Sequence, residues 1–177
     1  NNNVFYATTQ GATEYTDKIG DGAGVFKSTD RGNSWTQINN GLDSLETNIL
    51  TVDPNDSETL YLGTDDDGVY KSTDGGESWK KLTVSSLSKS FGVGDIIVDP
   101  QNSNNIYIGT VDYFRLSESR GVLGDFGVYK STNGGATWEE FNVGLNHLGV
   151  FSLELSEENR ILYAGTRAGG VYWISLD

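Results

Sequence analysis

Carboxylates are the groups in this sequence with the most scope for chemistry. The 177 residues include 25 Asp and Glu but only 12 Lys and Arg. A glycosidase needs two carboxylates about 5–10 Å apart, one as the acid and one as the base or nucleophile. Asp95 and Asp112 are candidates for such a pair, and Asp65 is expected on the same face. Nothing in the spacing singles out a pair, so the sequence assigns no catalytic residue.

Holding a cation is a second use for carboxylates. The run Asp65-Asp66-Asp67 and the segment 17–21 offer the hard oxygen ligands that calcium prefers. Neither segment matches the EF-hand loop, so a solvated acidic turn is the favoured interpretation and calcium the alternative. No other cofactor is expected. The sequence contains no cysteine, which excludes disulfides, thiol catalysis and cysteine metal sites. Its single histidine is His147.

Two long insertions, over residues 10–23 and 111–126, interrupt the repeat; the first carries one tyrosine, and the second carries several aromatic residues and two arginines. Such residues suit a recognition patch, because rings stack and guanidinium groups bind flat polar surfaces. An equally open interpretation is that the rings at 113 and 114 pin their loop to the scaffold. The predicted ligand-binding residues are Tyr15, Tyr113, Phe114, Arg115 and Arg120.

The net charge of −13 restricts the partners of the chain. An acidic protein repels phosphate backbones and anionic lipid surfaces, so no nucleic-acid partner is expected. No apolar run approaches the ~18 residues that a spanning helix needs, so membrane insertion is not expected either. Neutral glycans, cations and basic protein surfaces stay open as ligands, and the charge also serves solubility.

These residues must be positioned by a repeat. The segment 24–35 (GVFKSTDRGNSW) recurs at 68–79 and at 127–138, and a fourth copy opens at Gly170. Short segments rich in aromatic and β-branched residues flank each copy, bounded by Gly, Asn, Asp or Ser, which is the pattern of strands. The repeat unit is therefore four strands, A to D, with little helix. Four-stranded units at this period predict propeller blades.

The sequence Ser-x-Asp-x-Gly-x-Ser/Thr-Trp within the repeat resembles the Asp-box, also called the BNR repeat. It occurs in sialidases, xyloglucanase-type glycoside hydrolases, sortilin-type receptors and photosystem assembly factors. The resemblance covers nearly the whole chain and implies an all-β propeller of antiparallel blades. It does not select among enzyme, receptor and assembly factor, because one fold serves many functions.

The box residues themselves have a structural explanation. The acidic or amide side chain is expected to accept hydrogen bonds from the backbone of the turn between strands C and D. The glycine allows the chain to reverse, and the tryptophan packs into the blade or between blades. The box residues are Asp30, Gly32, Trp35, Asp74, Gly76, Trp79, Asn133, Gly135 and Trp138.

The strand count predicts about three and a half blades within one partial propeller. Residues 1–40 supply strands B, C and D of blade 1, residues 41–86 form blade 2, residues 87–143 form blade 3, and residues 144–177 supply strands A, B and C of blade 4. These give fourteen strands in an open arc. The start within a blade and the absence of methionine suggest a piece of a larger ring, which the remainder of the propeller or a second chain would complete.

Trp173 stands where the other blades carry lysine, which predicts a covered interface position. The leading functional hypothesis is a non-catalytic, secreted or cell-surface propeller that binds a glycan or a protein through the face of its B–C and D–A loops. One alternative is the C-terminal part of a xyloglucanase-type hydrolase. Another is a structural subunit that assembles through its open blade faces.

Overall fold

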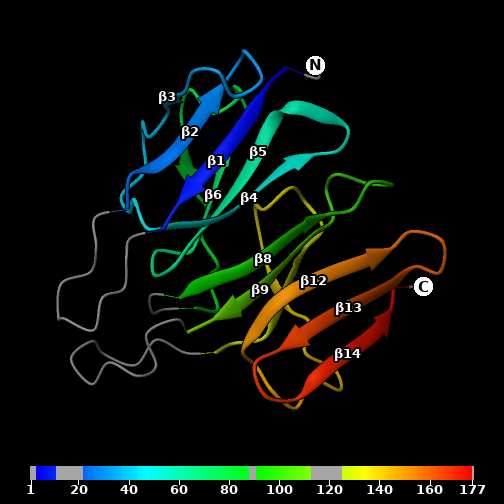
Figure 1. Cartoon of the computed structure of the whole chain (residues 1–177). Coiled ribbons are helices and arrows are strands. Elements are labelled where there is room, and N and C mark those ends of the chain that lie inside the picture. Colours follow the sequence, from blue (N-terminus) through cyan, green and yellow to red (C-terminus); the bar gives the residue numbers. More distant parts are fainter. Residues whose placement is uncertain (1–2, 11–21, 88–90, 113–124, 177) are drawn as a thin grey trace, which may run out of the picture.

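The computed structural model describes residues 3–10, 22–87, 91–112 and 125–176. Within these ranges the chain folds into fourteen strands and no helix, so the all-β prediction is confirmed. No helix long and apolar enough to cross a membrane occurs in this described part. The strands form four separate antiparallel sheets that fan out as blades (Figure 1).

In each sheet the strands are arranged in chain order from the inner to the outer edge. Blade 1 comprises β1 (Phe5–Thr9), β2 (Gly24–Ser28) and β3 (Thr36–Gln37). Blade 2 comprises β4 (Thr47–Asp53), β5 (Asp56–Thr64), β6 (Val69–Ser72) and β7 (Lys80–Lys81). Blade 3 comprises β8 (Gly92–Val98), β9 (Ile106–Val111), β10 (Val128–Ser131) and β11 (Glu139–Glu140), and blade 4 comprises β12 (Val150–Ser156), β13 (Ile161–Thr166) and β14 (Gly170–Ser175).

Hydrophobic side chains bury themselves between consecutive blades rather than within one. Blade 1 presents Val25 and Ile38 to Leu62 and Trp79 of blade 2. Similar clusters join blade 2 to blade 3 and blade 3 to blade 4. Because a single blade cannot cover its own faces, each blade takes its stability from its neighbours.

Strands β4, β8 and β12 form the inner wall of the arc, and β8 contacts both of the other two (Figure 1). Their close approach depends on Gly94, since a Cβ at this residue would lie 2.2 Å from the backbone oxygen of Val150. Each inner strand also carries a register shift near its first residues, for example between Val93 and Asp95 and between Val150 and Ser152. A bulge of this kind changes which face a side chain points to.

Candidate functional site

The Asp-box turns close one end of the blades. In blade 2, Asp74 Oδ1 accepts hydrogen bonds from Ser72 Oγ at 2.7 Å and from the backbone nitrogen of Ser78 at 3.0 Å. Ser78 Oγ donates to Asp74 Oδ2 at 2.6 Å. These hydrogen bonds, led by that from the Ser78 side chain, lower the pKa of Asp74 to about 2. The carboxylate is thus used within its own turn.

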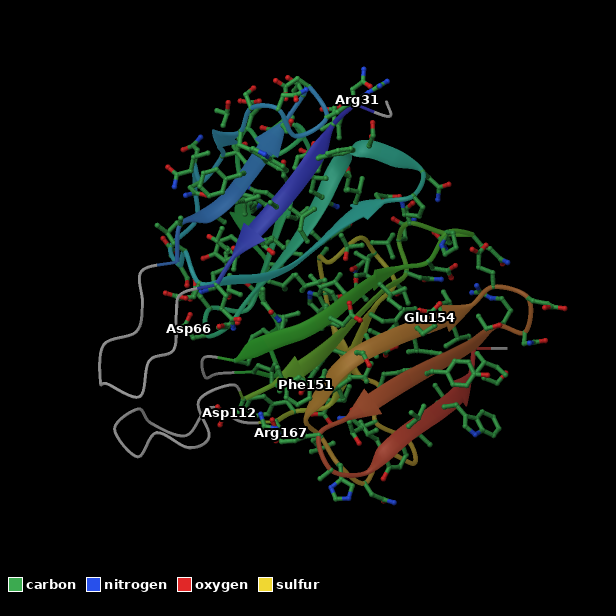
Figure 2. The ribbon with its side chains drawn as sticks, in the orientation of Figure 1. Arg31, Asp66, Asp112, Phe151, Glu154 and Arg167 are labelled. Carbon is green, nitrogen blue, oxygen red and sulfur yellow. The ribbon has the colours of Figure 1, made fainter. Side chains whose placement is uncertain are left out.

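The other two boxes repeat this arrangement. Asp30 Oδ1 accepts from the backbone nitrogen of Ser34 at 2.8 Å, and Asn133 Oδ1 accepts from that of Thr137 at 2.9 Å. The Asn133 side chain compensates for its missing charge by donating from Nδ2 to Thr137 Oγ1 at 2.8 Å. The three box glycines, Gly32, Gly76 and Gly135, all adopt positive φ. Arg31, in the first box, and Asp66, in the loop between β5 and β6, lie at opposite ends of the blades (Figure 2).

The box tryptophans pack against the preceding blade where one is present. Trp79 is 5% exposed and donates from Nε1 to the backbone oxygen of Ile38 at 2.8 Å. Trp138 is also buried, next to Leu82 and Val84 of blade 2. Trp35 does not have the packing predicted for it. It is 43% exposed, because no blade precedes blade 1 among the described residues.

The two candidate catalytic carboxylates, Asp95 and Asp112, have different partners. Asp95 Oδ1 accepts from the backbone nitrogen of Ile96 and Oδ2 from that of Leu153, both at 2.8 Å, so this side chain ties β8 to β12. Burial raises the pKa of Asp95. Asp112 is buried beyond the end of β9, where its backbone nitrogen donates to Asp125 Oδ1 at 2.8 Å. Asp95 therefore has a structural use that accounts for both of its oxygens.

The acidic run at residues 65–67 sends its three carboxylates to three sets of partners. Asp65 accepts from Gln10 Nε2 at 2.6 Å, Asp66 accepts from Ser44 Oγ at 3.1 Å, and Asp67 pairs with Lys81 and accepts from the Tyr70 hydroxyl. No group of three or more His, Cys, Asp or Glu side chains suited to a metal ion occurs among the described residues. This geometry gives no support to a calcium site at residues 65–67, and the other candidate segment, 17–21, lies outside the described residues, so calcium there stays a prediction.

Asp65 is nevertheless unusual within this run. Its side chain is buried, and its Oδ1 atom has no hydrogen-bond partner among the described residues. Burial, with smaller contributions from the Glu46 and Asp66 charges, raises the pKa of Asp65 to about 6. The loop end of blade 2 thus holds a buried acidic side chain, Asp65.

The predicted recognition residues Tyr15, Tyr113, Phe114, Arg115 and Arg120 lie outside the described residues. Their role stays a prediction. The described part of the loop end instead contains a second aromatic and cationic pair, on blade 4.

Phe151 and Arg167 form this pair. Phe151 lies on the inner strand β12 and is 41% exposed. The Arg167 guanidinium carbon lies 5.2 Å from the centre of the Phe151 ring, which is cation–π geometry. Arg167 also donates from its backbone nitrogen to the backbone oxygen of Gly149 at 2.8 Å and from its guanidinium group to the backbone oxygen of Asp112. Figure 2 shows Phe151, Arg167 and Asp112 together at the loop end of blades 3 and 4, with Glu154 further along β12.

Sequence reasoning missed this aromatic–guanidinium patch. In the sequence, Phe151 lies in a strand-like segment of blade 4 and Arg167 in a short loop between two such segments, and neither pattern indicates a site. Counting alternate residues back from the buried Leu153 and Leu155 places Phe151 in the core. The register shift between Val150 and Ser152 turns Phe151 outward instead, and the sequence alone does not display that bulge. Ring contact with Arg167 then follows from the fold.

Comparisons with known proteins agree with this architecture. Xyloglucanase Xgh74A of Acetivibrio thermocellus is 35% identical over 96 residues, which are 49% of this chain. The structure of a GH74 enzyme from Niastella koreensis matches 98% of the chain with a TM-score of 0.69 and 25% identity. That of an ancestral GH74 enzyme matches 86% of it with a TM-score of 0.69 and 26% identity.

The chain spans only part of each of these relatives: 11% of the length of the xyloglucanase and 27% and 20% of the two GH74 structures. A family model described as sortilin, neurotensin receptor 3, matches residues 23–171, which is most of the chain. This match agrees with the three Asp-boxes and the four blades described above. The chain belongs to the sortilin-Vps10 family of Asp-box propellers.

Proposed function

We propose that this chain binds a neutral glycan at the loop end of blade 4, with Phe151 as the platform for a sugar ring and Arg167 as a hydrogen-bond donor at its edge. The observation that carries this proposal is the exposed Phe151 ring held at 5.2 Å from the Arg167 guanidinium. A half-exposed ring on a rigid inner strand is an ordered apolar surface, and the guanidinium supplies donors in fixed directions.

Two further observations support a neutral sugar. The net charge of −13 disfavours anionic ligands over the surface as a whole. The xyloglucanase relative and the two GH74 enzymes are named for activity on glycans or for a glycoside hydrolase family. The secreted or cell-surface location expected from the sequence fits such a ligand and stays a prediction.

Calorimetric titration with xyloglucan oligosaccharides tests the proposal. Phe151→Ala is expected to weaken binding about 2- to 10-fold, the value of one aromatic contact of about 0.5–1.5 kcal/mol. Phe5→Ala is the matched control, because Phe5 is similarly exposed but lies on blade 1. Equal affinity of Phe151→Ala and the parent protein, or no binding by the parent, would refute a sugar platform at this residue.

Hydrolysis of a β-glucan is the second candidate function, favoured by the identity to the xyloglucanase. It requires a general acid and a base, for which Asp95 and Asp112 are the candidates. Release of reducing sugar from xyloglucan by the parent chain, abolished in Asp112→Asn, would establish this function. Binding without release would leave the non-catalytic proposal in place.

A further inference from the structure

Two asparagines in this chain precede a glycine, a dipeptide that is prone to deamidation because glycine has no Cβ to hinder attack by its backbone nitrogen. The pairs are Asn40-Gly41, in the turn between β3 and β4, and Asn133-Gly134, in the third Asp-box. In this reaction the glycine nitrogen bonds to the side-chain carbon Cγ, the Cγ–Nδ2 bond breaks, and ammonia leaves with the proton of that nitrogen. Water then opens the cyclic imide at either carbonyl, which gives aspartate or isoaspartate.

The attacking glycine nitrogen has different surroundings in the two pairs. The Gly134 nitrogen donates to the backbone oxygen of Asn104 at 3.0 Å. The Gly75 nitrogen, at the same place in the second box, donates to the backbone oxygen of Glu58 at 2.9 Å. The Gly41 nitrogen donates to no backbone or side-chain acceptor in the part of the chain that the structure describes. Attack from Gly41 therefore breaks no hydrogen bond to another segment of the described chain.

The asparagine side chains differ in the same direction. Asn133 Oδ1 accepts from Ser131 Oγ at 3.0 Å and from the backbone nitrogen of Thr137 at 2.9 Å. Its Nδ2 donates to Thr137 Oγ1 at 2.8 Å. Asn40 is exposed, and its Nδ2 donates to the backbone oxygen of Glu77 at 3.4 Å, beyond the usual range of about 2.7–3.2 Å. Rotation toward the next nitrogen therefore costs one weak hydrogen bond at Asn40 and three good ones at Asn133.

The turn that contains Asn40 packs directly on the box end of blade 2. The Asn40 backbone oxygen accepts from the Trp79 nitrogen at 2.9 Å. A Cβ on Gly41 would lie only 2.2 Å from the Trp79 backbone oxygen. Isoaspartate would lengthen the main chain by one carbon at this contact, and aspartate would place a carboxylate where the amide now donates to Glu77. Both products are expected to loosen blade 1 from blade 2.

The equivalent turn of blade 3 forms without an asparagine at this position. Leu145 donates from its backbone nitrogen to the Asn142 oxygen at 2.9 Å, which matches the hydrogen bond of 3.1 Å across the turn of blade 1. Val143 stands there in place of Asn40, and it is 81% exposed. The turn therefore does not need the amide, and valine is a substitute that the chain itself uses.

We propose that Asn40 is a deamidation site, which converts to aspartate and isoaspartate in the folded protein while Asn133 keeps its amide. Both asparagines have the same following residue, so the difference arises from the fold and not from the dipeptide. The conversion adds a negative charge near Glu77 at the contact between two blades. It accumulates with the age of the protein and lowers the stability of this contact.

Peptide mapping by mass spectrometry tests the proposal on the 177-residue chain, incubated in mildly alkaline buffer either folded or unfolded in guanidinium chloride. Trypsin releases residues 32–71 and 131–160 as separate peptides, and fragmentation locates the replaced amide. In the folded chain, conversion at Asn40 is expected to be at least about tenfold faster than at Asn133, which must first lose its hydrogen bonds. In the unfolded chain the two rates are expected to become similar.

Asn40→Val is the matched control, and Asn40→Asp reproduces one of the two products. Urea midpoints of the incubated parent and of Asn40→Asp are expected to lie below that of the fresh parent, whereas incubation leaves the midpoint of Asn40→Val unchanged. Three results would overturn the proposal: equal rates at the two asparagines in the folded chain, no conversion at Asn40 while the unfolded chain reacts, or an equal loss of stability by incubated Asn40→Val.

Discussion

Blade 2 and blade 4 place the same strands in the same register, yet their equivalent residues have opposite surroundings. Val69 is fully buried under β7, whereas Val171 is 69% exposed on the open edge of β14. Lys71 of blade 2 donates from Nζ to the Gly134 oxygen of the next blade at 3.1 Å, whereas Trp173 has solvent at that position. Whether a residue of the repeat is buried therefore depends on the segment that packs beside it and not on its position in the repeat.

The loop ends of the two blades differ in the same way. Asp65 and Arg167 each follow strand B and donate a backbone hydrogen bond to the residue before strand A. The Asp65 side chain is enclosed, whereas Arg167 reaches over the exposed ring of Phe151. At this end, the Asp65 side chain of blade 2 is buried, whereas the Phe151 ring of blade 4 is 41% exposed beside Arg167.

The largest expected contrast is between two tryptophans. Trp79→Ala in blade 2 is expected to lower the free energy of unfolding by about 3–5 kcal/mol, because it empties a packed site between blades and removes a hydrogen bond to Ile38. Trp173→Ala in blade 4 is expected to change it by less than about 0.5 kcal/mol. Urea denaturation measures both, and similar losses would contradict the contrast.

The contacts that join consecutive blades give the next contrast. Arg160 of blade 4 binds Asp99 of blade 3 with two hydrogen bonds, at 3.0 Å and 2.6 Å. Burial alone raises the pKa of Asp99, but the hydrogen bonds from Arg160 and other groups hold it below its ordinary value. Arg160→Ala leaves a buried carboxylate without its cation and is expected to cost about 3 kcal/mol.

The matching contact between blades 2 and 3 is a neutral donor, Ser103 Oγ, to Asp53 Oδ1 at 2.7 Å. Ser103→Ala is expected to cost only about 1 kcal/mol in the same denaturation experiment. An Arg160→Ala variant as stable as Ser103→Ala would show that blade 4 does not depend on its ion pair.

A pH-dependent contrast is expected from Asp65. Its pKa of about 6 in the folded protein exceeds the ordinary value, so the native state holds the proton more tightly than the unfolded chain. The stability contributed by Asp65 is complete below pH ~4 and is lost as the pH rises through about 6. Asp65→Asn is therefore expected to match the parent near pH 4 and to exceed it by about 2 kcal/mol at pH 7.

Urea midpoints of the two proteins between pH 4 and pH 8 provide this comparison. Asp95, whose pKa is also raised by burial, is present in both proteins, so the difference isolates Asp65. A difference that does not vary with pH would show that Asp65 is ionised in the folded protein throughout this range.

The repeat made the fold predictable from the sequence, but not the exposed site. Three copies of the box at matching places specify strands and turns, because each turn needs the same hydrogen bonds to its Asp or Asn. Trp35 and Trp79 look identical in the sequence, and only the presence of a preceding blade separates them. The outward orientation of Phe151 could not be predicted, because it depends on a β-bulge that no residue pattern in the sequence indicates.

Chemical-shift mapping with a xyloglucan oligosaccharide tests most directly whether the aromatic–guanidinium patch of blade 4 binds a glycan. In ¹⁵N-correlated spectra, the largest shifts are expected at Phe151, Ser152 and the backbone of residues 165–169, with little change at Asp65 or along β14. Shifts confined to blade 1 or to the β14 edge, or their absence at millimolar sugar, would contradict a glycan site on blade 4.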